Sequence, residues 1–190
     1  MSAFRKAAFA AALGIAALCA ALPSAPHAEL TVEAGGAPMS PSKSITENVA
    51  AAKDLSALAA ALNAAGLAGT LQGDGPFTLF APVNKAFDKL PKAMAETLLL
   101  PENKEVLARI LSYHVIPGKI SSARFIAAAK DGGGEAKYKT MEGGELIVRQ
   151  NGRRIEITGA KGEKAFVLIT DVPQRNGVIH VIDRVLMPDG

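Results

Sequence analysis

The sequence predicts an α+β fold in which several helices precede a mainly antiparallel, Greek-key-like sheet. Two observations lead to this prediction. Apolar residues recur with helical spacing up to a loop at Asp131 to Gly134, and beyond that loop they alternate with polar residues as in strands. The stretch from Val178 to Met187 follows an Asn-Gly turn and is almost entirely apolar, which is typical of a closing strand that is buried on both faces. A doubly wound parallel sheet does not fit this order of elements.

Residues 1–28 have the pattern of a secretory signal peptide. Two basic residues precede an acid-free apolar run from Ala7 to Leu22, which is too short for a comfortable membrane span, and small residues follow it up to Ala28. A core helix and a lipoprotein signal built on Cys19 are the alternatives. The run lacks a polar face, and Leu18 is not the small residue that lipidation favours before the cysteine. We therefore expect cleavage after Ala28 or three residues earlier, and a periplasmic or secreted protein.

The expected mature chain carries little net charge and no thiol. Loss of residues 1–28 removes two basic residues and no acid, which lowers the formal net charge of the 190-residue chain from +3 to +1. A charge so close to zero argues against nucleic acid as the partner. Cys19 is the one cysteine of the sequence and leaves with the signal peptide, so we expect no disulfide. Residues 29–44 contain glycine, proline and serine without an apolar period, which predicts a flexible tether before a domain at 45–188.

The first half of this domain predicts helices around one central strand. A stripe of leucines between Asp54, as N-cap, and Gly66, as C-cap, predicts a helix. The run from Phe77 to Ala81 is apolar on both faces, which indicates a central strand, and Asn84 is placed to cap a short helix after it. Further helices are expected over 92–99, over 101–114 and from residue 122 onward.

Asn151-Gly152 lies between two alternating stretches and predicts a hairpin of strands 145–150 and 153–158. In the two-residue-loop register Arg149 lies directly opposite Arg154 on the outer face. Together with Arg153, these residues form a basic cluster at the hairpin tip. Because opposed arginines repel one another, the cluster is a candidate site for an anionic polysaccharide or lipid headgroup. A solvated turn is the alternative.

Three stretches together resemble the fasciclin-like domain family. Residues 78–87 (Thr-Leu-Phe-Ala-Pro-Val-Asn-Lys-Ala-Phe) resemble its first signature box, residues 113–118 its Tyr-His motif, and residues 176–186 its second box. The stretches follow the family's order, and the chain resembles a secreted bacterial single-domain member over about 45–188. The resemblance implies a wedge-shaped β-sandwich with several helices packed along one side. The residues of the boxes taken as structural are Asn84, Phe87, His180 and Asp183.

The resemblance also implies a role in cell adhesion or in attachment to a surface or matrix. In adhesive relatives the Tyr-His segment, and an Asp followed by an aliphatic residue before the second box, are tied to receptor contact. The matching interaction residues here are Tyr113, His114, Asp171 and Val172. The family usually has Asp-Ile at the last pair, and the animal receptors are not expected as partners. A turn role for Asp171 is the alternative.

His114 on an apolar helical stripe and His180 on an apolar strand are expected to be neutral, hydrogen-bonded core residues. For His114 the expected partner is the backbone or Asn84. Alternation puts His180 and Asp183 on opposite faces of their strand, and two imidazoles without a third ligand make a poor metal site. We therefore expect neither a metal nor a cofactor.

Catalytic motifs are missing from the sequence. It has no Gly-x-Ser-x-Gly elbow, no phosphate loop, no His-Glu-x-x-His and, after processing, no cysteine. The serines near His114, at 112, 121 and 122, lack an orienting carboxylate. We expect a non-enzymatic domain that binds a cell-surface or matrix protein or polysaccharide. The alternative is a carrier of an apolar small molecule, resembling the family members that bind carotenoids, in a groove between alanine-lined helices and the sheet.

Overall fold

The computed structural model describes residues 31–91, 94, 97–98 and 100–189, so the signal peptide predicted over 1–28 and most of the helix predicted over 92–99 lie outside the described residues. The helices are α1 (Ile45–Ala51), α2 (Ser56–Ala65), α3 (Asn84–Phe87), α5 (Lys104–Tyr113) and α6 (Ser122–Asp131). The strands are β1 (Val32–Ala34), β2 (Ala37–Met39), β3 (Phe77–Pro82), β4 (Val115–Pro117), β5 (Glu135–Lys139), β6 (Glu145–Asn151), β7 (Arg154–Thr158), β8 (Lys164–Gln174) and β9 (Gly177–Ile182).

Within the described residues, seven strands form one mixed sheet in the order β4-β3-β9-β8-β7-β6-β5. All neighbours in this sheet are antiparallel except β3 and β9, which run parallel with Phe77 beside Gly177. The mainly antiparallel α+β fold is therefore confirmed, and both apolar runs are central strands. The one parallel pair arises because the long connection from β3 brings β9 into the middle of the sheet, beside β3 and in the same direction.

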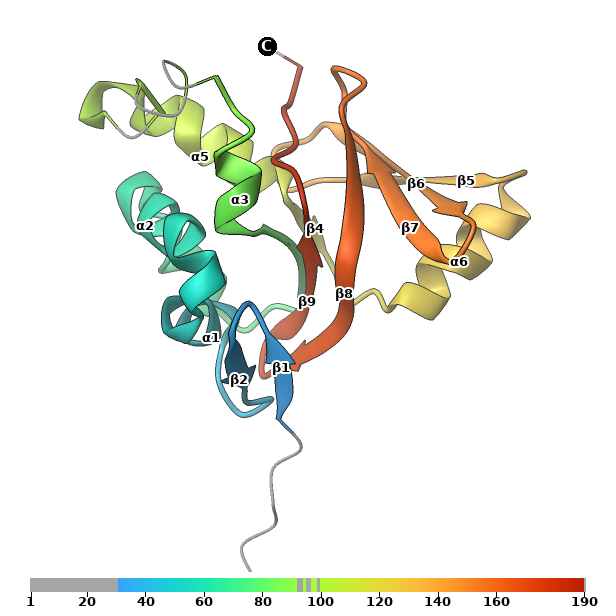
Figure 1. Cartoon of the computed structure of the whole chain (residues 1–190), viewed down its shortest axis with the longest axis horizontal. Coiled ribbons are helices and arrows are strands. Elements are labelled where there is room, and N and C mark those ends of the chain that lie inside the picture. The colour runs from blue at the N-terminus through green and yellow to red at the C-terminus, as the bar shows by residue number, and fades with distance from the viewer. Residues whose placement is uncertain (1–30, 92–93, 95–96, 99, 190) are drawn as a thin grey trace, which may run out of the picture.

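β8 joins the two halves of the sheet. Its first residues, Lys164 to Phe166, pair with β7, and the remainder pairs with β9 through register shifts between Val167 and Val172. Irregularities of this kind bend a strand and increase its twist. In Figure 1 the sheet accordingly turns at β8, so that β5, β6 and β7 lie at an angle to β4, β3 and β9. The two halves enclose a wedge, and α1, α2 and α5 lie on the outer side of β3 and β9.

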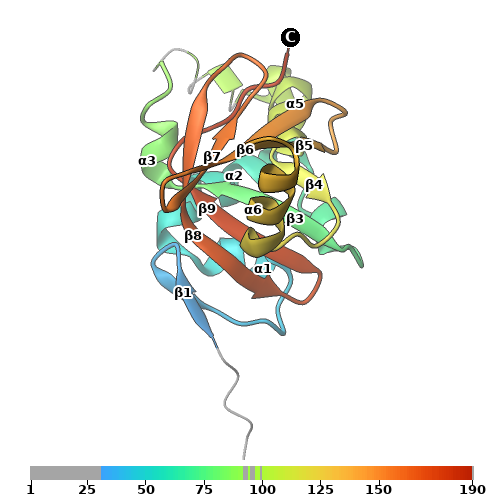
Figure 2. The same ribbon diagram turned by 90° about the vertical axis from the view of Figure 1, so that its right-hand side faces the viewer.

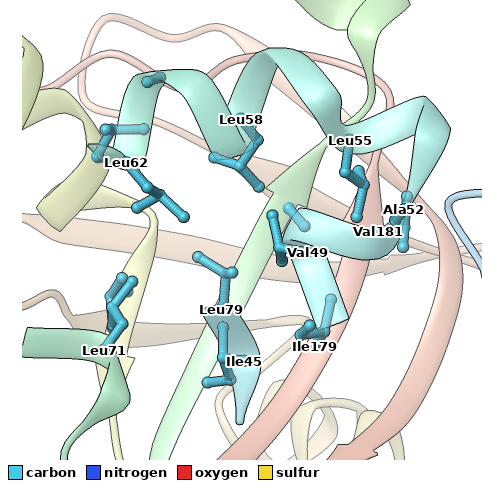
Figure 3. Packing of buried hydrophobic residues seen from close by; sticks show 14 of the residues in the cluster. Ile45, Val49, Ala52, Leu55, Leu58, Leu62, Leu71, Leu79, Ile179 and Val181 are labelled. Carbon is cyan, nitrogen blue, oxygen red and sulfur yellow. The ribbon is translucent and has the colours of Figure 1, made fainter. Parts of the chain in front are cut away.

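The first core lies between the helices and one face of β3 and β9. Leu58 and Leu62 of α2 lie over Leu79 of β3, and α1 adds Val49 to the same cluster (Figure 3). Gly66 ends α2 with a φ of +74°, and the amide of the next residue bonds to the carbonyl of Leu62, which completes a Schellman cap. The predicted leucine stripe and its glycine stop are confirmed.

The second core fills the wedge between the two halves of the sheet. α6, which faces the viewer in Figure 2, inserts Phe125 among the buried side chains of both halves. The ring of Phe125 lies 5.7 Å from that of Phe80 and meets Tyr138 edge-on at 4.9 Å between centroids. Aromatic side chains therefore occupy the space between the halves.

Part of the segment predicted as a flexible tether is folded. β1 and β2 form a hairpin in which Met39 is 0 % exposed, and the carbonyl of Gly35 accepts a 2.8 Å hydrogen bond from the amide of Asp54. Ser44 then begins α1 with a capping box that it shares with Glu47. The tether prediction is wrong for residues 31–44, because three-residue strands are too short to show a period in the sequence.

Asn84 caps a helix other than its own. Its side-chain oxygen accepts a 2.9 Å hydrogen bond from the amide of Ala57 in the first turn of α2. Its amide nitrogen donates to the carbonyl of Lys53 and the hydroxyl of Ser56, at 2.9 and 3.0 Å. The predictions that Asn84 caps α3 and that Asp54 caps the leucine helix are wrong, since neither helix has a cap from its own N-cap side chain.

β6 and β7 form the predicted hairpin in a different register. Asn151 pairs with Arg154, so the loop is Gly152-Arg153, and Arg149 faces Glu156. Gly152 adopts a φ of +61° at the first loop position, as a type II′ turn requires. The predicted opposition of Arg149 and Arg154 is wrong, and so is the repulsion inferred from it.

Candidate interaction surface

Tyr113 ends α5 inside the second core. Its ring is 0 % exposed, and its hydroxyl donates a 2.7 Å hydrogen bond to the carbonyl of Glu145 while accepting one of 2.9 Å from the amide of Ala160. Burial raises the pKa of this phenol to about 12. Tyr113 therefore joins α5 to the first residue of β6 and to the loop after β7, and its side chain does not reach the surface.

His114 follows Tyr113 and is also 0 % exposed. Its Nδ1 donates to the carbonyl of Ile110 at 2.7 Å, and its Nε2 accepts a 3.0 Å hydrogen bond from the amide of Leu186. These partners require the neutral ring, and burial lowers its pKa to about 4. Of the two partners expected for His114, the backbone is confirmed and Asn84 is wrong.

His180 occupies a second buried site on β9. Its Nδ1 accepts a 3.2 Å hydrogen bond from the amide of Asp171, and its Nε2 donates to the carbonyl of Ile120 at 2.9 Å. Burial lowers the pKa of this imidazole as well, against smaller opposing effects of the Ile120 hydrogen bond and the Asp171 charge. The expectation of a neutral, hydrogen-bonded core histidine is confirmed.

Asp171 lies in the irregular part of β8 with a φ of +58°. Its carboxylate accepts a 2.7 Å hydrogen bond from the amide of Ser122, the first residue of α6, and another from the hydroxyl of the same serine. A carboxylate at this position is stabilised by the unpaired amides of a helix N-terminus. Asp171 thus positions α6 on the sheet.

Ser122, Asp171 and His180 are the residue types of a catalytic triad, but their connections differ from one. In a triad the carboxylate binds Nδ1 of the histidine, and Nε2 faces the serine hydroxyl. Here the hydroxyl donates to the carboxylate, and both ring nitrogens are bonded to main-chain groups. The imidazole has no position from which to take a proton from Ser122.

The predicted interaction residues therefore separate into buried and exposed groups. Val172, like Tyr113 and His114, is 0 % exposed, and Asp171 is half-buried with its carboxylate directed to α6. In this structure these side chains can influence a partner only through the surface they support. The arginines of the β6–β7 hairpin are exposed.

The three arginines differ in their surroundings. Arg149 forms an ion pair with Glu135 on β5, with a 3.0 Å hydrogen bond from its Nε. Arg154 lies over the ring of Phe166, with its guanidinium carbon 5.7 Å from the centroid. Arg153 is exposed at the loop. Among the described residues, neither Arg153 nor Arg154 has an acidic partner within ion-pair distance, so the predicted cluster is reduced to two residues with available charge.

No group of three or more histidine, cysteine, aspartate or glutamate side chains that could hold a metal ion occurs within the described ranges. Asp183 accepts a 2.8 Å hydrogen bond from the amide of Phe166 and forms an ion pair with Lys89 at 3.3 Å. Its partners lie apart from those of His180.

The family model for the fasciclin domain matches residues 53–188. The chain belongs to the fasciclin domain family. Protein sll1483 of Synechocystis is 41% identical over 144 residues, which span 76% of this chain and 73% of that protein. Human periostin is 34% identical over 146 residues, which are 77% of this chain but 16% of periostin. The cell surface glycolipoprotein MPB83 of Mycobacterium bovis is 35% identical over 138 residues, 70% of this chain and 53% of its own length.

A solved structure has the same fold as this fasciclin domain. A FAS1 domain pair from the insect cell adhesion molecule Fasciclin I superimposes with a TM-score of 0.69 at 19% identity, over 76% of this chain and 51% of that chain. At this identity the likeness shows the fold alone, and it confirms the α+β fasciclin fold. Where helices are described in the fasciclin domain, none combines the length and the apolar character that a membrane crossing needs.

Two surface hollows of the fasciclin domain were not anticipated from the sequence. One of about 540 Å³ lies between the tip of the β6–β7 hairpin, β8 and α6. The other, of about 480 Å³, lies between α5 and the C-terminal residues, with Val106, Ile110 and Met187 among its lining. One apolar residue beside each hollow could have indicated it from the sequence. Leu168 and Val106 are large apolar residues at outward positions of their strand and helix, and they are 56% and 49% exposed.

Proposed function

We propose that this fasciclin domain is a non-enzymatic interaction module that attaches to a cell-surface or matrix component outside the cytoplasm. The observation that carries the proposal is that the polar groups at the predicted site are either bonded inside the domain or exposed at its surface. His114, His180 and Asp171 are used by internal hydrogen bonds, whereas Arg153 and Arg154 carry available charge at the surface. The names of relatives as a cell surface glycolipoprotein and as a cell adhesion molecule support the same role.

The proposed location rests on the N-terminal sequence. A secretory signal over residues 1–28 directs the chain to the periplasm or the exterior, where the domain meets its partner. We expect the intact mass of the protein purified from its own host to correspond to a chain that begins near Glu29. A mass that retains the apolar run from Ala7 to Leu22 contradicts this location.

Binding to isolated cell envelope tests the proposed function directly. The fluorescently labelled protein is titrated onto envelope fragments of its host, and the bound fraction is measured by sedimentation. A specific interaction saturates and is displaced by excess unlabelled protein. Binding that is absent, or that rises linearly without displacement, contradicts an interaction role at this surface.

A second candidate function is transport of an apolar small molecule. The space between α1, α2 and the sheet, where an alanine-lined groove was expected, is filled by the first core (Figure 3). The hollow beside α5 is the better place for such a ligand, because most of its lining is apolar and its volume of about 480 Å³ lies in the usual range of ligand pockets. The apolar residues of its lining are Met94, Leu98, Val106, Ile110, Met187 and Pro188.

Native mass spectrometry with an absorption spectrum separates the two functions. Protein purified from its host without denaturant should show no extra mass if it is an interaction module. Extra mass or visible absorbance that organic solvent removes supports the carrier. In that case Val106→Glu should abolish the extra mass or absorbance. Leu168→Glu, at an exposed apolar residue outside this hollow, should leave that signal unchanged.

A further inference from the structure

The hollow between the hairpin tip and α6 results from the way the sheet divides. The ladder between β7 and β8 ends at the pair of Glu156 and Phe166, although β7 begins two residues earlier at Arg154 and β8 continues to Gln174. Beyond this pair β8 follows β9, and β7 stays with β6. The two strands therefore diverge, and the first turns of α6 supply the third wall with Ser122 and Ile126.

This groove carries positive charge that the described residues do not neutralise. Arg153 and Arg154 belong to its lining, and the neighbouring carboxylates have other partners. Glu135 pairs with Arg149, Glu156 pairs with Lys164 at 3.1 Å, and Asp171 binds Ser122. An arginine stacked on an aromatic ring, as Arg154 is on Phe166, keeps the N–H donors at the edge of its guanidinium available for a carboxylate.

The groove also offers apolar surface beside these charges. Its lining consists of four polar residues, Ser122, Arg153, Arg154 and Thr170, and four aliphatic residues, Ile126, Ile155, Val167 and Leu168. The arginines, Leu168 and Thr170 are exposed, so the groove is open along its length to solvent. A lining that mixes guanidinium, hydroxyl and aliphatic groups suits a ligand that carries acid groups, hydroxyls and C–H faces together.

We propose that this groove binds a segment of an acidic polysaccharide. A uronate carboxylate accepts hydrogen bonds from Arg153 and Arg154, and the C–H face of the sugar ring lies against Leu168 and Ile126. The volume of about 540 Å³ lies within the range of small-ligand pockets, and the open rim lets a longer chain continue on both sides. This assignment rests on the proposed interaction function and names the class of its partner.

Binding of an oligogalacturonate, measured by calorimetry at low salt with the processed full chain, tests the assignment. We expect saturable binding that weakens as salt is added, because the contact is partly ionic. The double variant Arg153→Gln/Arg154→Gln should bind at least about tenfold more weakly and depend less on salt. Leu168→Asn should weaken binding and leave the salt dependence unchanged. A neutral glucan oligosaccharide of the same length should not bind.

Arg149→Gln is the matched control. It removes one positive charge from the same hairpin, where the double variant removes two, but Arg149 is paired with Glu135 and does not belong to the groove, so binding should stay within about twofold of wild type. Circular dichroism and the thermal midpoint of each variant show that the fold is retained. An equal loss in Arg149→Gln, or no binding by the wild type, overturns the site. Binding of anionic phospholipid vesicles through Arg153 and Arg154 without binding of the oligogalacturonate overturns the polysaccharide as ligand.

The same double variant separates this inference from the function on which it rests. If it binds envelope fragments as the wild type does, the groove is not the contact, and the interaction function stands. If the wild type itself fails to bind any envelope fraction, the interaction function is overturned independently of the calorimetric result.

Discussion

Nε2 of His114 accepts a hydrogen bond from the amide of Leu186, so the end of α5 is fixed to the last residues of the domain. The bond exists only while the ring is neutral, because a protonated Nε2 is a donor and cannot accept. The same condition holds for His180, whose Nδ1 accepts from the amide of Asp171. Both histidines of the described chain thus couple distant segments in a way that depends on protonation.

The first prediction is a loss of stability in mild acid. The pKa of His114 is about 4 in the folded state and near its usual 6.5 in the unfolded chain, so the unfolded chain binds the proton first as pH falls. The stabilisation is complete above pH 6.5 and is lost as pH falls from there toward 4. For His114 alone, we expect the free energy of unfolding to drop by about 2 kcal/mol between pH 7.5 and 5. His180 acts in the same direction.

Urea unfolding across this pH range checks the prediction. A window that ends at pH 5 keeps Glu47 and Glu156 out of the measurement, because their pKa values are lowered from 4.5 and their effects occur at lower pH. His114→Gln should be less stable at pH 7.5 and should have a shallower pH dependence. A wild-type free energy that is constant from pH 7.5 to 5 contradicts the hydrogen-bonding scheme of both histidines.

The second prediction concerns Asp171. Asp171→Ala removes the carboxylate from the N-terminus of α6 and places alanine at a φ of +58°, so we expect a loss of about 2–3 kcal/mol in the free energy of unfolding. Asp171→Asn keeps an acceptor and tolerates this backbone conformation, so its loss should be below about 1 kcal/mol. Equal stability of alanine variant and wild type would show that Asp171 does not position α6.

The third prediction tests the N-terminal hairpin. Met39 is fully buried against the first core, so Met39→Ala should cost about 2–5 kcal/mol in the free energy of unfolding. Met141→Ala is the matched control, because Met141 is 39% exposed and its truncation should cost less than about 0.5 kcal/mol. If Met39→Ala leaves the free energy of unfolding unchanged, the segment behaves as the flexible tether expected from the sequence.

The fourth prediction concerns how much the hydroxyl of Tyr113, as distinct from its ring, contributes to stability. Tyr113→Phe leaves the carbonyl of Glu145 and the amide of Ala160 without this partner, which should cost about 1–3 kcal/mol in thermal or urea unfolding. Tyr138→Phe serves for comparison. The hydroxyl of Tyr138 makes no hydrogen bond to the described residues, so this change should be nearly neutral. Similar costs at the two positions contradict a structural role for the Tyr113 hydroxyl.

The sequence predicted correctly those features that depend only on residues close together in the chain. The leucine stripe, the stop at Gly66, the burial of His114 and the inward face of β6 and β7 all follow from spacing along one segment. The same spacing put Tyr113 beside His114 without revealing that its hydroxyl would bond to Glu145 and Ala160, which lie far along the chain. The hairpin register also differed, because a loop of Gly152-Arg153 satisfies the local turn as well as Asn151-Gly152 does.

Contacts between distant segments explain the other differences. Asn84 was expected to cap the helix it begins, and nothing near it in the sequence shows that Ala57 presents a free amide to it. No strand was expected after the helix over 101–114, whereas Val115–Pro117 form β4 because they pair with β3. The sequence predicted the arginines at the hairpin tip but not the groove beside them, because the groove depends on where β7 and β8 separate.

The position of β9 in the sheet has a consequence for the order in which the chain can fold. This strand is the last element of the chain, yet it lies in the middle of the sheet and pairs with β3, which is made long before it. Neither core is complete until β9 has joined, so a high contact order delays folding until the whole chain is available. A chain exported behind an N-terminal signal would cross the membrane before it could close, and β3 would need shielding from other chains during that interval.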